Sequence, residues 1–233
     1  MRSSLYISSP INALLEGFYR DDITIKTLKK KGDFGIGTFN NLDGEMIALN
    51  GSFFRLDLDG NSQPVSGGMK TPFATVCHFR TMMAEEMATP LSYPAFGQQL
   101  KQLLPSDNMF YAIHMEGRFR SVETRSVPRT ENYQPLSQAT GQQKIRNFKN
   151  VAGHLVGFYT PAFVPSVNVP GYHFHFIDSG FSAGGHLLRC EPEHLDIRLQ
   201  IFFTMELTLP KTLDYLTASF TRDAREDLEK AER

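Results

Sequence analysis

Apolar and polar residues alternate along much of this chain with a period of two, the spacing that is typical of strands. The clearest stretch is 194–209, where every odd position is apolar and every even position except Phe202 is polar. This alternation predicts one long strand, or two strands with a bend, that bury one face. Shorter strands are predicted at 109–116, 151–158, 172–177 and 186–190.

Helical periodicity is confined to short segments. Apolar residues three and four positions apart predict amphipathic helices at 10–19 and 93–104, and Pro105 ends the second of them. The closing run, 221–233, is charged enough to form either a surface helix or a solvated tail. The segment 81–94 is lightly patterned, and we expect a loop there.

Glycines mark the turns and the places where backbones approach closely. The Asp-Gly pairs at 43–44 and 59–60 predict hairpin turns within and after the stretch 32–58, which is rich in glycine and aromatic residues. Gly35 and Gly37 lie in the run KKKGDFGIGTFN, which lacks the Gly-Lys-Ser/Thr end of a phosphate-binding loop. We therefore interpret these two glycines as sites of tight backbone packing.

These elements together predict a mixed α/β fold in which strands dominate. We expect two tightly associated subdomains, each built on a β-sheet or a half-barrel. The predicted N-terminal subdomain, residues 1–122, holds a mixed sheet. The predicted C-terminal subdomain, residues 123–233, is rich in strands, carries the histidine site described below and ends in the charged run.

Composition allows a globular enzyme and argues against several other classes. With 233 residues and 41% hydrophobic content, the chain can bury a substantial core. A formal net charge of -1 argues against nucleic acid and anionic membranes as partners, so we expect a small molecule. Cys77 and Cys190 lie in apolar segments and are expected to be buried free thiols. The sequence shows neither a signal peptide nor an apolar run of membrane-spanning length, and we expect a cytoplasmic protein.

The strongest chemical signal is the pair His173 and His175 in GYHFHFID, followed by His186 in SAGGHLL. Side chains two apart on a strand point the same way, with Cα atoms about 6.5 to 7 Å apart, and two imidazoles can bridge that span through a metal ion. The intervening Asp-Ser-Gly and Gly-Gly predict a turn that brings His186 back to the pair. Three neutral imidazoles suit zinc and leave a coordination position open for substrate.

Spacing alone leaves a second interpretation open, in which these are core or surface histidines that bind no metal. The other histidines lack a partner at such spacing and are interpreted as structural; they are His78, His114, His154 and His194. A zinc finger is excluded, because the sequence has no closely spaced cysteine pairs. Judged by local sequence, Glu45 after a turn and Arg125 in ETRSVPRT are surface residues.

Six motifs extend the argument beyond the histidines. They are GDFGIGTFNNLDGEMIALNGSFFRL, TPFATVCHF, LPSDNMFYAI, VETRSVPR, VGFYTPAF and GYHFHFIDSGFSAGGH. Their order and spacing closely resemble the α-acetolactate decarboxylase family, from residue 32 to at least residue 209. The resemblance implies a two-domain α/β zinc enzyme, usually a homodimer, that decarboxylates 2-acetolactate to acetoin and CO2 in the acetoin and butanediol pathway.

The resemblance also implies which residues act. The family's zinc ligands fall on His173, His175 and His186. Its active-site glutamate falls on Glu45, and its active-site arginine falls on Arg125. Zinc would then be the Lewis acid that stabilises an enediolate, which makes pyridoxal and thiamine cofactors unnecessary.

Two further positions are less well defined by the resemblance. A family glutamate near the C-terminus falls on Glu232 by its spacing from His186, and Glu229, about one helical turn away, is a rival. The linker 179–183 has the expected length before Gly-Gly-His but carries Phe181 where polar character is expected. This departure affects the expected pocket shape and the tolerance for larger acetolactate homologues.

The residues taken alone remain compatible with other functions. A three-histidine zinc hydrolase would use the same site to activate water. A cupin-like iron or nickel enzyme also carries His-x-His and a later histidine. A non-catalytic small-molecule binding module is the least favoured, because a pure binder would be free to lose Glu45, Arg125 or a histidine. Formation of CO2 and acetoin from acetolactate separates the decarboxylase from these alternatives.

Overall fold

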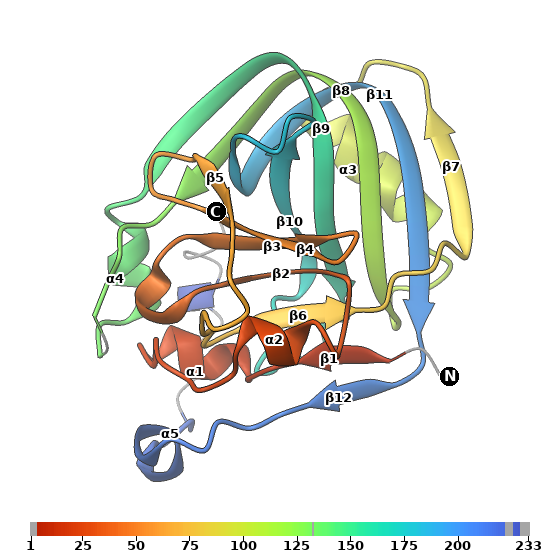
Figure 1. Cartoon of the computed structure of the whole chain (residues 1–233). Coiled ribbons are helices and arrows are strands. Elements are labelled where there is room, and N and C mark those ends of the chain that lie inside the picture. The colour runs from red at the N-terminus through yellow and green to blue at the C-terminus, as the bar shows by residue number, and fades with distance from the viewer. Residues whose placement is uncertain (1–3, 132, 222–225, 229–233) are drawn as a thin grey trace.

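The computed structural model describes residues 4–131, 133–221 and 226–228, which form two β-sheets and a few short helices (Figure 1). The strand order is β12-β1-β6-β2-β3-β4-β5 in the first sheet and β10-β9-β8-β11-β7 in the second. The prediction of a strand-rich mixed α/β fold is therefore confirmed. No helix within the described ranges is both long and apolar enough to cross a membrane.

The first sheet is built mainly from the N-terminal part of the chain. Its strands are β1 (Leu5–Ile7), β2 (Phe34–Thr38), β3 (Glu45–Leu49), β4 (Ser52–Leu56), β5 (Ser62–Pro64), β6 (Ala74–Cys77) and β12 (Met205–Leu207). Neighbouring strands are antiparallel except β1 and β12, which are parallel. The Asp-Gly pairs at 43–44 and 59–60 lie between paired strands, as the sequence predicts.

Glycine allows β2 to pack closely against its neighbours. A Cβ at Gly35 would lie 2.3 Å from the carbonyl oxygen of Thr75, and a Cβ at Gly37 would lie 2.4 Å from that of Phe73. Both distances are far below van der Waals contact. The interpretation of these glycines as sites of tight backbone packing is therefore confirmed.

The longest strands of the second sheet arch over the first (Figure 1). Its strands are β7 (Met83–Met87), β8 (Phe110–Ser126), β9 (Lys144–Thr160), β10 (Gly171–Asp178) and β11 (Gly184–Phe202). Because β10 pairs with both β9 and β11, four of these strands close on themselves at the end that carries the β10–β11 turn. That end of the second sheet holds the histidines.

Several elements differ from their predicted extents. The long alternating stretch contains the end of β11 and then β12, so it is two strands with a break between them. β8 and β9 continue beyond their predicted ranges because they pair with each other as far as Ser126 and Lys144. The loop prediction for 81–94 is wrong, since β7 pairs there with β11. The subdomain boundary after residue 122 falls inside β8 and stays a prediction.

The helices are short and lie around the sheets. They are α1 (Ile11–Leu15), α2 (Ile25–Leu28), the 3-10 turn η1 (Asn40–Leu42), α3 (Tyr93–Leu103), α4 (Leu136–Thr140) and α5 (Leu213–Thr217). Helix α3 matches its predicted range, and α1 occupies the first half of its range. Figure 1 shows α3 behind the arch of β8 and β11.

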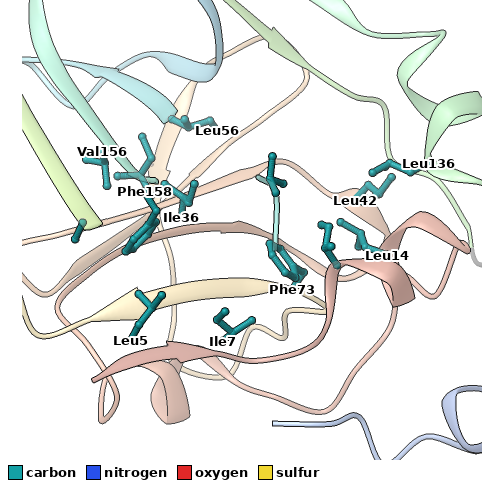
Figure 2. Packing of buried hydrophobic residues seen from close by; sticks show 14 of the residues in the cluster. Leu5, Ile7, Leu14, Ile36, Leu42, Leu56, Phe73, Leu136, Val156 and Phe158 are labelled. Carbon is teal, nitrogen blue, oxygen red and sulfur yellow. The ribbon is translucent and has the colours of Figure 1, made fainter. Parts of the chain in front are cut away.

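Apolar side chains bury both faces of the second sheet. One large cluster lies between the sheets and includes Leu5, Ile36, Phe73 and Phe158 (Figure 2). Another cluster fills the space between the second sheet and α3, which contributes Phe96 and Leu100. The three histidines lie on the face that meets the first sheet, where polar groups must find partners to be buried without a large cost.

Candidate metal centre

The β10–β11 hairpin places the three histidines side by side. His175 on β10 lies directly opposite His186 on β11, and His173 is two residues away on the same face. Asp178 stabilises the turn, because its Oδ1 accepts hydrogen bonds from the backbone amides of Ser182 (2.6 Å) and Ala183 (3.1 Å). The hairpin therefore brings His186 back beside His173 and His175, as the sequence predicts.

Glycine at position 184 makes the close approach of the two strands possible. A Cβ there would lie 2.0 Å from the carbonyl oxygen of Phe176 on β10. Any larger residue would push β11 away from β10 and separate His186 from its partners. The Gly-Gly pair before His186 is thus a structural requirement of the cluster.

The three imidazole rings form one compact group. The ring centroids lie 5.2 Å apart for His173 and His175, 4.9 Å for His173 and His186, and 5.4 Å for His175 and His186. One nitrogen from each ring lies within 4.8 Å of the others. His175 and His186 are buried, with 1% and 4% of their surface exposed.

Nitrogen spacing within this group fits a tetrahedral metal ion. Nε2 of His173 lies 3.2 Å from Nδ1 of His186. Two ligands with Zn–N bonds of about 2.0–2.1 Å at a tetrahedral angle stand about 3.3 Å apart. The residues present therefore fit zinc in both donor type and donor spacing.

A backbone carbonyl fixes the protonation pattern of His175. Its Nδ1 lies 2.9 Å from the carbonyl oxygen of Met46 on β3. A carbonyl only accepts, so Nδ1 carries the proton and donates it, and the lone pair is left on Nε2. The first sheet thereby orients a ligand that belongs to the second sheet.

Burial keeps the imidazoles of His173 and His175 neutral. Desolvation lowers the pKa of His173 to about 3, and the positive charge of Arg125 contributes in the same direction. Desolvation also lowers the pKa of His175 well below its usual value, with His173 and Arg125 adding to the effect and the bond to Met46 opposing it. Neutral imidazoles keep the lone pairs that metal binding needs.

Glu45 and Arg125 lie beside the histidines and not on the surface, contrary to the expectation from their local sequence. Glu45 begins β3 and is 7% exposed, and Arg125 on β8 is 5% exposed. Oε1 of Glu45 lies 3.4 Å from Nη1 of Arg125, and its Oε2 lies 3.6 Å from Nε2 of His175. The carboxylate therefore stands between a fixed cation and a metal ligand, with one oxygen facing each.

Local structure explains how each of these two residues reaches the site. Arg125 lies directly opposite His186 in the pairing of β8 with β11. Glu45 follows a distorted turn in which Gly44 has a φ of 98°, a left-handed conformation that glycine adopts readily. The Thr38 hydroxyl donates a 2.9 Å hydrogen bond to the Gly44 carbonyl and closes this turn.

A small cavity of about 40 Å³ opens between the histidines, Glu45 and Arg125. The sequence did not mark its apolar walls, which come from the shared core between the sheets: Ile11, Leu14, Leu42, Phe73, Val127 and Leu136. A larger cavity of about 410 Å³ reaches His173 and His186 from the side of α3. The cluster thus has a polar face toward Glu45 and Arg125 and an apolar surrounding.

The predicted C-terminal glutamates, Glu232 and Glu229, lie outside the described residues. Leu228 is described, is 5% exposed and belongs to the same apolar cluster as Leu14 and Leu42. The chain at position 228 therefore packs into the core that also forms the cavity walls.

Known proteins give an independent line of evidence. Residues 5–222 match the family described as Alpha-acetolactate decarboxylase. Alpha-acetolactate decarboxylases from Methanosarcina mazei and Bacillus subtilis are 44% and 40% identical to this chain, covering 98% and 99% of it and 80% and 91% of their own lengths. A crystal structure of the enzyme from Bacillus subtilis strain 168 has a TM-score of 0.96 at 39% identity and covers 99% of both chains. With a family match over most of its length and relatives at this identity, the chain belongs to the alpha-acetolactate decarboxylase family.

Proposed function

We propose that this chain decarboxylates 2-acetolactate to acetoin and CO2 at a zinc ion held by His173, His175 and His186. As a member of its family the chain is a carboxy-lyase that acts on a small molecule. The observation that carries the zinc assignment is the compact cluster of three histidines beside Glu45 and Arg125.

The reaction breaks the bond between the carboxylate carbon and C2 of the substrate. CO2 leaves without the bonding electron pair, which passes toward the neighbouring ketone, and a proton must then reach C2 to give acetoin. When bound, zinc supplies a Lewis acid that stabilises negative charge on the ketone oxygen. The chain itself must hold the carboxylate, exclude water and deliver the proton.

Arg125 is suited to hold the substrate carboxylate. Its guanidinium stays protonated and offers a planar fork of donors that matches a carboxylate. Its burial beside Glu45 and opposite His186 fixes the position of this fork. The apolar walls from Leu42, Val127 and their neighbours suit the two methyl groups of 2-acetolactate and keep water out.

Glu45 is placed to orient the substrate hydroxyl or to move a proton. One of its oxygens faces Arg125 and the other faces Nε2 of His175. A carboxylate within reach of the reacting atoms is a suitable general acid or base. We assign the second carboxylate to Glu232, with Glu229 as the alternative, and the packing of Leu228 in the core beside the cavity supports either one.

The homodimeric state, the cytoplasmic location and the place in acetoin and butanediol formation stay predictions that rest on the sequence. None of them enters the argument for the reaction, which depends on the residues of a single chain.

Matched histidine variants test the proposal. His175→Ala should abolish both zinc retention at this three-histidine cluster and the release of CO2 and acetoin from 2-acetolactate. His78→Ala is the control, since His78 is exposed and its ring lies 3.6 Å from Asp33, far along the chain from the cluster. A His175→Ala protein that retains full turnover would contradict the proposal. A wild-type protein that binds zinc and hydrolyses esters but leaves acetolactate intact would favour the zinc hydrolase instead.

A further inference from the structure

A second group of metal-ligating side chains lies elsewhere on the same sheet face. His114 and Glu116 are two residues apart on β8, so their side chains point to the same side. His154 on β9 lies directly opposite Glu116 in the pairing of the two strands. The sequence separates His114 from His154 by 40 positions, and only the strand register brings them together.

The nitrogen spacing in this group matches that of the first cluster. Nε2 of His114 lies 3.3 Å from Nδ1 of His154, and the ligand atoms of His114, Glu116 and His154 all lie within 4.8 Å of one another. About 3.3 Å is also the separation of two imidazole nitrogens on a tetrahedral zinc ion. A single ion can therefore contact both rings without a large shift.

Neighbouring rings hold the two imidazoles in place. His114 and His154 stack with centroids 5.4 Å apart at 23°. Phe34 contacts His114 edge-on at 5.9 Å, and Phe181 stacks on His154 at 5.5 Å and 19°. Phe181, the apolar departure in the β10–β11 linker, thus covers His154 of this second histidine pair. Such packing limits rotation of the rings and reduces the entropy lost when an ion binds.

Burial also keeps this pair neutral. His114 and His154 are 6% and 9% exposed. Desolvation lowers the pKa of His114 to about 4, with His154 and Arg198 contributing, and desolvation lowers the pKa of His154 as well. The lone pairs are therefore available near neutral pH. Glu116 is exposed and leaves the solvent side of the group open.

Other charged groups around the cluster have opposing effects on a cation. Arg198 lies opposite His114 on β11, and its Nη2 lies 3.9 Å from Oε2 of Glu116. This guanidinium occupies the neighbourhood that a metal ion would take and repels it. Asp196 lies opposite Glu116 on β11, and Glu86 on β7 lies opposite Asp196, so two further carboxylates attract a cation to this part of the sheet.

We infer that His114, His154 and Glu116 form a second site for a divalent cation of zinc-like preference, separate from the three-histidine cluster. Two histidines and a glutamate are an established zinc ligand set. The ion would link β8 to β9 and keep an open position toward solvent. It would replace the weak contact of Glu116 with Arg198.

Zinc titration of the full chain tests this site. After dialysis against a chelator, calorimetric titration with Zn2+ should give two ions per chain for the wild type and one for Glu116→Gln or His154→Asn at the same zinc concentration. Glu116→Gln changes an exposed residue and keeps its size, so it should fold even where the histidine variant does not. At higher zinc concentration, Glu116→Gln should bind the second ion at least about tenfold less tightly than the wild type does.

Three variants separate this site from its alternatives. Arg198→Gln removes the competing cation and should tighten the weaker ion several-fold. His78→Ala is the matched control and should leave both ions bound, because His78 is exposed and its ring lies 3.6 Å from Asp33, outside both histidine groups. His175→Ala should remove the other ion and leave this one. If Glu116→Gln, His154→Asn and the wild type bind equal numbers of ions with equal affinity, the histidine pair is only hydrogen-bonded and the inference is wrong.

Discussion

Removing one member of the buried pair Glu45 and Arg125 should cost far more stability than removing both. Nη1 and Oε1 lie 3.4 Å apart, and the two side chains are 9% and 5% exposed. At that distance and an effective dielectric constant of about 20, the Coulomb attraction is about 5 kcal/mol. Each charge has lost most of its hydration, so a charge that loses this ion pair keeps its desolvation cost and loses the Coulomb attraction that offsets it.

The two single substitutions should not be equivalent. Glu45→Gln leaves the guanidinium, which cannot release its proton, and should reduce the free energy of unfolding by about 3–5 kcal/mol. Arg125→Met leaves a carboxylate that lies 3.6 Å from Nε2 of His175. Unlike a guanidinium, a buried carboxylate can become neutral by taking up a proton, so the loss of stability should be smaller. The double variant contains neither charge and should be more stable than the sum of the singles predicts.

Urea unfolding of the four proteins, followed by circular dichroism, measures this coupling. The cycle should be run in chelator, because a bound zinc ion would itself compensate Glu45 and mask the loss of Arg125. We expect a coupling free energy of about 3–5 kcal/mol without metal and a smaller value with zinc. A coupling below about 1 kcal/mol in chelator, the value of an exposed pair, would refute the account of this pair as buried and mutually dependent.

Three further predictions concern the strand packing, the arginine and the second histidine pair. Gly157→Ala places a Cβ 2.1 Å from the carbonyl oxygen of His173. Urea unfolding should therefore show a loss of about 1–3 kcal/mol in the free energy of unfolding, and zinc titration should show weaker zinc binding. Arg125→Lys should fold but lower kcat/KM for acetolactate about 100-fold in steady-state assays, because a point charge replaces the fork. In chelator, the free energy of unfolding should fall as the pH drops from about 6.5 to about 4, because burial lowers the pKa of His114 to about 4 and its ring takes up a proton mainly in the unfolded chain. His114→Asn should show a flatter dependence of this free energy on pH. A dependence identical to that of the wild type would contradict the lowered pKa of His114.

Local sequence was sufficient to predict those features that depend on residues close together in the chain. The alternation in GYHFHFID, a turn and a third histidine predicted a hairpin cluster, and β10 and β11 form it. The Asp-Gly turns and the glycines of β2 were predicted for the same reason, because a backbone conformation or a close contact leaves little choice of residue.

Contacts between residues far apart in the sequence could not be predicted from local patterns. Glu45 and Arg125 look like surface residues because nothing near them in the chain reveals that β3 and β8 meet the histidines; only the family resemblance suggested it. His114 and His154 were interpreted as structural because their partnership depends on the register of β8 against β9. A register is set by the whole of two long strands, and a shift of one residue would turn His154 to the other face.

Zinc reconstitution tests the central claim most directly. The full chain, stripped with a chelator and dialysed, is reloaded with increasing amounts of Zn2+ while acetoin and CO2 released from 2-acetolactate are measured at each step. We predict no turnover by the stripped protein, and turnover that rises in proportion to the occupancy of the site that His175→Ala abolishes. Full turnover by the stripped protein, or zinc binding at that site without release of acetoin and CO2, would contradict it.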